Sequence, residues 1–355
     1  MLQRSARPSP ALSIPILYVE TISDFTPDFL VQMHRRGCRD RAAVVVQFTK
    51  DGKTPVQYGD FRKVMERDDI QVIVQATPDH WHTIINLAAV RAKKDVHGEK
   101  PLTLTIDEGK RLVKAVRERG VVLQTGTQQR SDRKFRLACE LVPNGRIGEL
   151  QKPSVFAPAG IRGGPFQPQT PPDGFNWDFG LGQAPQVDYL KERCHGTFHW
   201  WWDYSGGPVT DWGAHHNDIA RWAIGQDGPA EIEARVVTEP IPGGYTTPLE
   251  FETTLTWGNG VKTTPDDSPY GAVLKPDGQR NGVKFEGTDG WIWVNRADLK
   301  ASKDEIIETP LPDNTARLEA SNDHMGNFFD CVVRAKIRSH RSRPAIVPPT
   351  SGISS

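Results

Sequence analysis

Two adjacent histidines stand between two aspartates in the segment VTDWGAHHNDIARW, which spans residues 209–222. A Gly-Gly-Pro sequence before this segment and a glycine after it predict that it forms a single helix. Residues at positions i, i+4 and i+7 share one face of a helix. Asp211, His215 and Asp218 should therefore line one stripe, while His216 should point about a quarter turn away from it.

A histidine beside carboxylates can be a metal ligand, a proton relay or one member of a buried hydrogen bond. An Asp–His pair at i, i+4 suits a metal ion, but the sequence contains neither the HExxH pattern nor a third strong ligand. We therefore predict no metal site. Spacing alone does not decide between a proton relay and a structural hydrogen bond at His215.

Two further motifs place polar side chains where predicted strands end. The motif ATPDHWH (76–82) follows a β-rich run, at the edge of a parallel sheet where helix N-termini offer amide groups to ligands. The alternative is an ordinary strand–helix turn with proline at the first helical position. The motif GEKP (98–101) places Lys100 at the same edge, where a lysine can orient a substrate hydroxyl or move its proton. The alternative is a solvated surface lysine.

The elements that position these motifs fall into two groups. Between about residues 42 and 150, short apolar runs alternate with helical patterns, which predicts βαβ units and a parallel sheet covered on both faces. Thr105 and Glu108 have the spacing of a capping box, and Gly120 ends the same predicted helix. After residue 150, strand signals and a hairpin-type turn at 288–290 predict an antiparallel sheet in an α+β domain. The predicted strands are 43–48, 71–77, 95–97, 121–126, 231–237, 250–257, 283–286 and 291–294.

We expect a first domain over residues 1–150, of which 1–41 are atypical, a second domain over 151–335, and a disordered tail over 336–355. Lys plus Arg and Asp plus Glu are 44 each, which argues against a nucleic-acid partner. No apolar run reaches membrane-spanning length, and the four scattered cysteines form no CxxC motif. The expected location is cytoplasmic, or periplasmic if a signal segment is missing from the start.

The three motifs resemble, in this order and spacing, those of the glucose–fructose oxidoreductase/inositol dehydrogenase/MocA family. YGDFRKVMERDDIQVIVQATPDHWH resembles the stretch leading to its third-strand TP…H motif, and GEKPLTLTIDEGKRLV resembles its EKP motif and following helix. WWDYSGGPVTDWGAHHNDIARWAIG resembles its second-domain helix. The resemblance extends from about Tyr58 to Cys331. It implies an α/β Rossmann-like parallel-sheet domain, followed by an α+β domain with a large, mainly antiparallel open sheet that often mediates homo-oligomerisation.

The resemblance also implies an NAD(P)-dependent dehydrogenase, with NAD or NADP as cofactor, that acts on a hydroxyl carbon of a sugar, cyclitol or related carbohydrate. Lys100, Asp211 and His215 match the family's catalytic residues. His215 would take up the hydroxyl proton, Lys100 would stabilise charge on the same oxygen, and Asp211 would orient His215 or bind a neighbouring hydroxyl. The positions expected to line the cofactor are Thr77, Pro78, His82, Glu99 and Lys100. The expected substrate contacts are Gln128, Arg130, His195, Trp202 and Tyr204.

Both ends of the chain depart from the family pattern. The family opens with a glycine-rich loop that approaches the pyrophosphate closely, whereas this sequence has no glycine before Gly37. After SNDHMGNFFDCVVRAK the family continues into a further helix, which RSHRSRPAIVPPTSGISS does not resemble. We hypothesise a mis-set start site or a reading-frame shift. Two alternative functions stay open: an NAD-dependent glycoside hydrolase of the same fold, and a non-catalytic carbohydrate-binding protein that has lost the cofactor loop.

Overall fold

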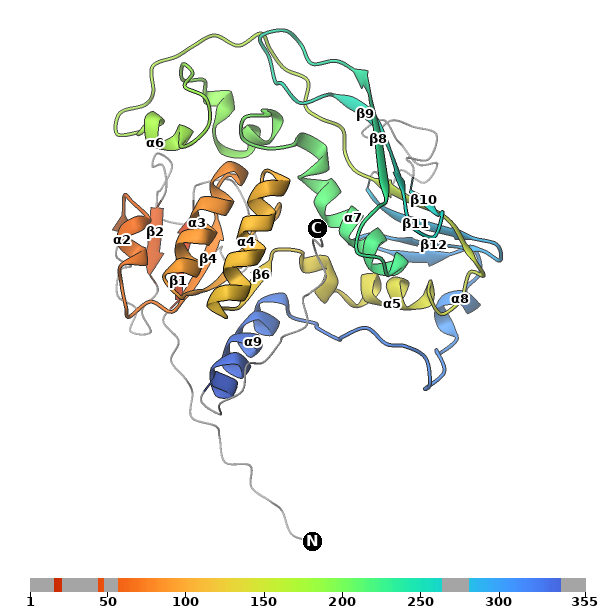
Figure 1. Ribbon diagram of the computed structural model, residues 1–355. Helices are drawn as coiled ribbons and strands as arrows, with labels where there is room; N and C mark the ends of the chain where they lie inside the picture. Colours follow the sequence, from red (N-terminus) through yellow and green to blue (C-terminus); the bar gives the residue numbers. More distant parts are fainter. Residues whose placement is uncertain (1–15, 21–43, 48–56, 264–280, 340–355) are drawn as a thin grey trace.

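The computed structural model describes residues 16–20, 44–47, 57–263 and 281–339 (Figure 1). Most of the atypical region 1–41 and most of the expected tail lie outside these residues. The described parts form two sheet-based units, one at each side of the molecule, which meet around a central helix, α7 (Trp212–Ile224). No helix among the described residues is both long and apolar enough to cross a membrane.

The first unit is built on a six-stranded sheet in the order β3-β2-β1-β4-β5-β6. Strands β1, β4, β5 and β6 run parallel to one another, as the alternating pattern predicts, whereas β2 is antiparallel to both β1 and β3. The strands are β1 (Ile16–Glu20), β2 (Val44–Gln47), β3 (Gln57–Tyr58), β4 (Val72–Ala76), β5 (Asp95–Gly98) and β6 (Leu123–Thr125).

Two crossover helices, α3 (Asp79–Arg91) and α4 (Ile106–Arg119), connect the parallel strands. The predicted capping box is present in α4, because the Thr105 side chain accepts a hydrogen bond from the Glu108 amide and the Glu108 carboxylate accepts one from the Thr105 amide. Gly120 ends the helix in the left-handed conformation, which glycine adopts without steric cost. The short helix α2 (Arg62–Met65) precedes β4.

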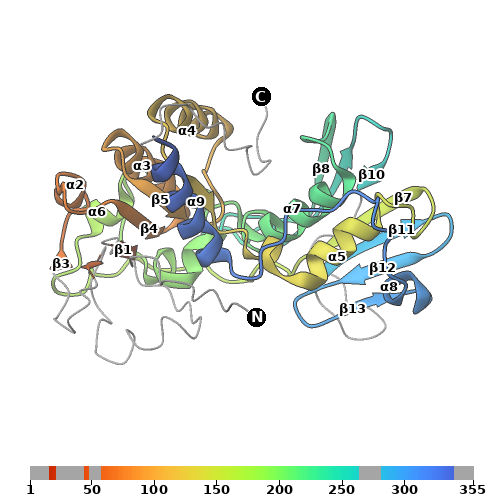
Figure 2. The ribbon, with the colours of Figure 1, turned by 90° about the horizontal axis from the view of Figure 1, so that it is seen from below.

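The last helix of the chain, α9 (His324–Ser339), returns to the first sheet (Figure 2). Phe328 and Val332 pack with Val72, whereas Ile73 packs in the cluster that includes residues of α3 and α4. Successive strand residues point to opposite faces, so α9 covers the face that α3 and α4 leave open. A segment expected in the second domain therefore completes the core of the first.

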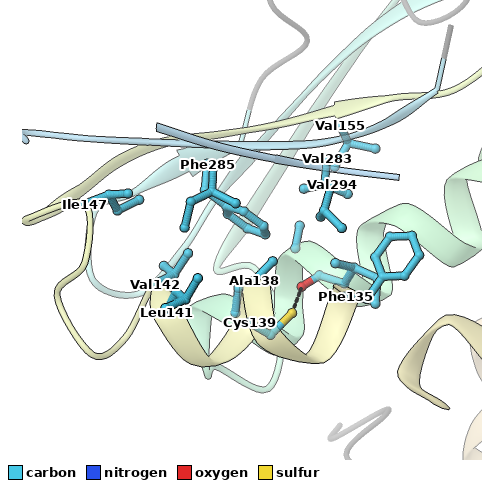
Figure 3. Close-up of a cluster of buried hydrophobic side chains, with 14 of the residues drawn as sticks. Phe135, Ala138, Cys139, Leu141, Val142, Ile147, Val155, Val283, Phe285 and Val294 are labelled. Carbon is cyan, nitrogen blue, oxygen red and sulfur yellow. Dashed lines mark hydrogen bonds between the residues drawn. The ribbon is translucent and has the colours of Figure 1, made fainter. Parts of the chain in front are cut away.

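The second unit contains two antiparallel sheets, in the orders β10-β9-β8 and β13-β12-β11-β7. Helices α5 (Arg133–Leu141) and α7 contribute to the main core, which Phe135, Cys139, Val283 and Phe285 help to fill (Figure 3). The spatial division thus differs from the expected boundary at residue 150, because the apolar face of α5 is buried against the second unit. The remaining elements are β7 (Leu150–Phe156), β8 (Glu231–Thr238), β9 (Glu250–Thr256), β10 (Lys262–Thr263), β11 (Gly282–Gly287), β12 (Trp291–Val294), β13 (Leu299–Ala301) and α8 (Glu305–Glu308).

The Pro- and Gly-rich excursion after β7 folds back over the start of α3 (Figure 1). It contains the short helix α6 (Trp177–Leu181) and leads into an aromatic cluster in which Trp200 and Trp201 pack with Tyr245, from the connection between β8 and β9. The indole nitrogen of Trp81 donates to the Gly180 carbonyl at 3.2 Å. The excursion therefore fixes the start of α3, which borders the predicted ligand-binding edge of the sheet.

Candidate active site

The structure brings Lys100 and Asp211 together, although they are 111 residues apart in the chain. Lys100 follows β5, and its buried Nζ donates to Asp211 Oδ1 at 2.7 Å. Asp211 immediately precedes α7, so the contact joins the carboxyl edge of the first sheet to the start of the central helix. The side chain of Asp211 is 28% exposed, against 6% for Lys100, so a ligand can approach the pair from the aspartate side.

The helix begins later than the sequence predicts. The residues Gly207–Val209 form a separate 3-10 turn, and Asp211 stands at the N-cap of α7 with φ −83° and ψ −100°. Asp211 is therefore not in the helical stripe expected for it, because its backbone is not helical. Asp218, inside the helix, binds Arg130, so the two aspartates serve different partners.

His215 lies one helical turn after Asp211 and is only 4% exposed. Burial lowers the pKa of His215 to about 2, and the charge on Lys100 acts in the same direction. Its Nδ1 is buried and has no hydrogen-bond partner in the described part of the chain. The side chain is thus a neutral imidazole with an unused polar atom, and the carboxylate of Asp211 is bonded to Lys100.

His216 differs from its neighbour in what it contacts. It is fully buried, and its ring stacks on Trp212 with the centroids 5.7 Å apart. Burial lowers the pKa of His216 to about 3. This helical face packs into the protein, which agrees with the predicted separation of the two histidines.

Four residues expected to line the cofactor lie where β4 and β5 end. Pro78 is the N-cap of α3, and the buried Thr77 precedes it. His82 is also buried, with Nε2 2.8 Å from the Thr77 carbonyl and Nδ1 2.6 Å from the Pro101 carbonyl. His82 therefore links the TP motif to the EKP motif, because its two ring nitrogens each contact a backbone carbonyl of one motif.

Glu99 brings a carboxylate to the same edge. Burial raises the pKa of Glu99, and the neighbouring Lys100 charge opposes that shift. A side chain on Gly126 would place a Cβ only 2.7 Å from Glu99 Oε2, so glycine at this position lets the Glu99 carboxyl lie against the backbone. Close by in the sequence, the buried Oε1 of Gln128 has no partner among the described residues. Orphaned acceptors and a carboxyl at the ends of parallel strands fit the amide-bearing nicotinamide half of a dinucleotide.

The predicted substrate contacts lie in contrasting surroundings. Arg130 donates to both carboxylate oxygens of Asp218, at 2.6 and 2.7 Å, and lies over the Trp222 ring. Tyr204 is buried, and its hydroxyl accepts a hydrogen bond from Arg193 at 3.1 Å, so it belongs to the aromatic cluster. His195 and Trp202 are exposed, the latter by 54%. In the part of the chain that the structure describes, none of these four side chains forms a hydrogen bond with the Lys100 or Asp211 side chain.

One functional candidate is absent from the sequence-based predictions. Arg296 lies between β12 and β13, and its guanidinium carbon is 4.5 Å from the centre of the Trp212 ring. Its charge acts on Asp211 and His215. No motif marks this position, because it approaches the site only through the fold of the second unit. Over the described residues, no cluster of three or more His, Cys, Asp or Glu side chains could hold a metal ion.

Two models of one oxidoreductase family match the chain and together cover more than half of it. The NAD-binding Rossmann-fold domain matches residues 37–127, and the C-terminal alpha/beta domain matches residues 162–332. The chain is 27% identical to scyllo-inositol 2-dehydrogenase (NAD(+)) of Bacillus subtilis over 285 residues, which span 77% of this chain and 71% of that protein. It is 24% identical to levoglucosan dehydrogenase of Pseudarthrobacter phenanthrenivorans, across 66% of this chain and 58% of that protein.

Solved structures with the same fold include levoglucosan dehydrogenase in complex with NADH and levoglucosan. It has a TM-score of 0.54 and 20% identity, and the match covers 82% of this chain and 76% of that chain. Aldose-aldose oxidoreductase from Caulobacter crescentus has a TM-score of 0.53 and 20% identity, with 81% and 75% covered. At this level of identity the structural likeness establishes the fold.

Proposed function

Because the chain belongs to the glucose–fructose oxidoreductase/inositol dehydrogenase/MocA family of oxidoreductases, we propose that it oxidises or reduces a hydroxyl carbon of a sugar, cyclitol or related carbohydrate. The cofactor of this reaction is NAD or NADP. The observation that carries the proposal is the contact between Lys100 and Asp211, one helical turn from the neutral His215. These groups converge from two separately built units at the carboxyl edge of the first sheet.

Lys100 is the group best placed to bind the reacting oxygen. Its ammonium donates one hydrogen bond to Asp211, and an ammonium has three hydrogens to donate. A second donor aimed at the substrate oxygen stabilises the negative charge that develops as the hydroxyl proton leaves. Asp211 holds the ammonium in place, and its partial exposure allows it to accept a hydrogen bond from a neighbouring hydroxyl.

His215 receives the hydroxyl proton in this proposal. Its neutral ring can accept a hydrogen bond, and burial together with the nearby Lys100 charge disfavours the protonated ring. In the oxidation direction the proton therefore passes on to solvent, and in the reduction direction the ring delivers a proton to the alcohol product. NAD(P), when bound, supplies the carbon that exchanges hydride with the substrate. Thr77, Pro78, His82, Glu99 and Lys100 are the residues proposed to hold or line its nicotinamide end.

A panel assay tests this function. The purified chain is incubated with NAD or NADP and with myo-inositol, scyllo-inositol, levoglucosan or glucose, and reduced cofactor is followed by absorbance. We expect net reduction with at least one polyol, and a loss of at least about 100-fold in kcat for His215→Asn. His199→Asn is the matched control, because the His199 ring contacts the nearby Gly196 carbonyl at 2.8 Å and forms no other hydrogen bond within the described residues.

The same panel separates the alternative functions. Release of sugar from a glycoside without net reduced cofactor would support the glycoside hydrolase. No change in NADH fluorescence at millimolar cofactor would support the non-catalytic protein. Unchanged activity in His215→Asn would contradict the assigned proton acceptor.

We also propose that the chain forms a homo-oligomer through its second unit. Strand β8 lies at the edge of a sheet and exposes residues on both faces, among them Ile232 at 65% and Val236 at 41%. An exposed apolar edge strand favours association. Light scattering of wild type and Ile232→Lys would show a monomer only for the variant, and a monomeric wild type would contradict the proposal.

A further inference from the structure

Arg296 stands beside the proposed active site and has no carboxylate partner among the residues that the structure describes. Its guanidinium lies over Trp212, the residue that follows Asp211. In the described part of the chain, the nearby cations Lys100 and Arg130 each form an ion pair at 2.6–2.7 Å, and Arg296 forms none within 4.0 Å. Stacking uses the face of the guanidinium and leaves its N–H edge able to donate.

The turn that carries Arg296 is fixed by hydrogen bonds. The buried Asn295 accepts hydrogen bonds at Oδ1 from the amides of Ala297 and Asp298, at 2.9 and 2.6 Å. The Asn295 amide donates to the Asp298 carbonyl at 2.9 Å. Arg296 therefore projects from a rigid base, so little conformational entropy is lost when its side chain binds a ligand.

The charges around this position do not balance. Lys100 and Arg296 are cationic, and Asp211 is the one carboxylate bonded to either of them in the described residues. In the described residues Arg296 therefore contributes a positive charge that no carboxylate neutralises by direct contact, and it is exposed.

We propose that Arg296 binds a carboxylate of the substrate, so that the enzyme acts on a sugar acid or a carboxylated cyclitol in preference to a neutral sugar. This inference rests on the proposed dehydrogenase function. A single carboxylate matches the one unpaired charge of Arg296, and its planar pair of oxygens matches the fork of N–H groups on a guanidinium. A phosphate monoester, with nearly two negative charges, would exceed it.

Calorimetric titration with D-glucuronate, D-glucose and D-glucose 6-phosphate tests the proposal. We expect the wild type to bind glucuronate at least about ten-fold more tightly than glucose. Arg296→Met should abolish this preference, and Arg296→Lys should keep part of it because the charge remains. Arg111→Met, which alters an exposed arginine paired with Asp107, is the control and should keep the full preference. Circular dichroism melting confirms that each variant is folded.

Equal binding of glucuronate and glucose by the wild type would overturn the proposal, as would an undiminished preference in Arg296→Met. Tighter binding of glucose 6-phosphate than of glucuronate would overturn the assignment to a carboxylate. NADH can be titrated in place of the sugars. If Arg296→Met weakens the binding of NADH but not that of glucuronate, Arg296 belongs to the cofactor site and the proposal is wrong. Cofactor reduction assays separate this from the proposed function. Turnover of glucuronate that is no faster than turnover of glucose, and that Arg296→Met leaves unchanged, would refute the inference alone. Arg296-dependent binding of glucuronate without turnover of any substrate would refute the dehydrogenase alone.

Discussion

Two ion pairs connect the first unit to helix α7, and their geometries differ. At the start of the helix, Lys100 contacts one oxygen of Asp211 at 2.7 Å. Two turns later, Arg130 contacts both oxygens of Asp218, at 2.6 and 2.7 Å, and also lies over Trp222. The side chains of the second pair are 15% and 18% exposed, whereas Asp211 is 28% exposed.

This difference separates a pair that can exchange partners from one that holds the structure together. A single contact leaves hydrogens of the Lys100 ammonium for a ligand, so the pair can reorganise when substrate arrives. The two parallel hydrogen bonds of Arg130 fix both side chains, and stacking adds to that constraint. We therefore expect substitutions at the first pair to affect catalysis and substitutions at the second to affect stability.

The largest expected effect is on catalysis by Lys100→Met. The variant loses the donor to the substrate oxygen and the partner of Asp211, so kcat/KM should fall by about 100- to 10,000-fold. Steady-state kinetics with the best substrate of the panel measures this. Lys114→Met is the matched control, because Lys114 also faces a carboxylate, Glu118 at 3.9 Å, but on the exposed surface of α4. A loss of less than about ten-fold, with normal folding, would contradict the reactive role of the Lys100 pair.

The second effect, on stability, should come from Asp218→Asn. The substitution leaves the charge of Arg130 buried and only partly bonded, which should lower the free energy of unfolding by about 3 kcal/mol. Urea denaturation followed by tryptophan fluorescence measures the change. Asp227→Asn, at an exposed aspartate paired with Arg221 at 3.5 Å, should cost less than about 1 kcal/mol.

The Asp218→Asn variant also tests whether Arg130 contacts the substrate. If Arg130 only links the units, Asp218→Asn should leave KM within about three-fold of the wild type when measured well below the melting temperature. A large rise in KM in the folded variant would support direct contact between Arg130 and the substrate.

Acid should lower the free energy of unfolding through the buried histidines His215 and His216, near the Lys100 end of α7. The pKa values of His215 and His216 are lowered to about 2 and about 3, mainly by burial, so both favour the neutral state when folded. The unfolded histidines bind protons below about pH 6.5. Stability is therefore complete above that pH and is lost as the pH falls toward the folded values, by about 1.4 kcal/mol per pH unit for each histidine.

Chemical denaturation between pH 7 and 4 measures this loss, and His216→Phe should reduce its slope by removing one buried imidazole while keeping a ring on Trp212. An unchanged slope would contradict the assignment. Near the second pair, burial lowers the pKa of His324, and the charges of Asp218 and Arg130 act on that pKa in opposite directions.

The sequence was sufficient to predict the local elements, and two residues that it singled out, Lys100 and Asp211, lie in contact. Their catalytic role stays a prediction. The capping box of α4 and the strands β4, β5, β11 and β12 depend on nearby residues, and the structure has them as predicted. The packing of elements that are distant in the chain could not be predicted from the sequence. The assignment of α5 and α9 to their cores depends on which of several apolar faces meet, and periodicity does not specify that partner.

Prediction of the candidate site from the sequence was limited in the same way. Helical spacing grouped Asp211 with Asp218, but the N-cap backbone turns Asp211 toward Lys100, and Arg130 engages Asp218. Arg296 carried no signal at all, because a single arginine in a hairpin turn resembles any surface arginine. Backbone conformation at helix ends and the docking of distant turns are decided by tertiary contacts, which the motifs do not contain.

The smallest expected effect is at Trp222, which lies beside the second pair and packs against the main core. Trp222→Phe keeps an aromatic ring but weakens the attraction for the Arg130 guanidinium, whose central carbon is 4.9 Å from the Trp222 ring centre. The free energy of unfolding should fall by about 1 kcal/mol, and kcat/KM should stay within about two-fold, because the Lys100 pair is untouched. A double-mutant cycle with Asp218→Asn isolates the coupling: the two losses should not add, since both act through Arg130. Full additivity would mean that Trp222 stabilises the core independently, and that Asp218 alone positions Arg130.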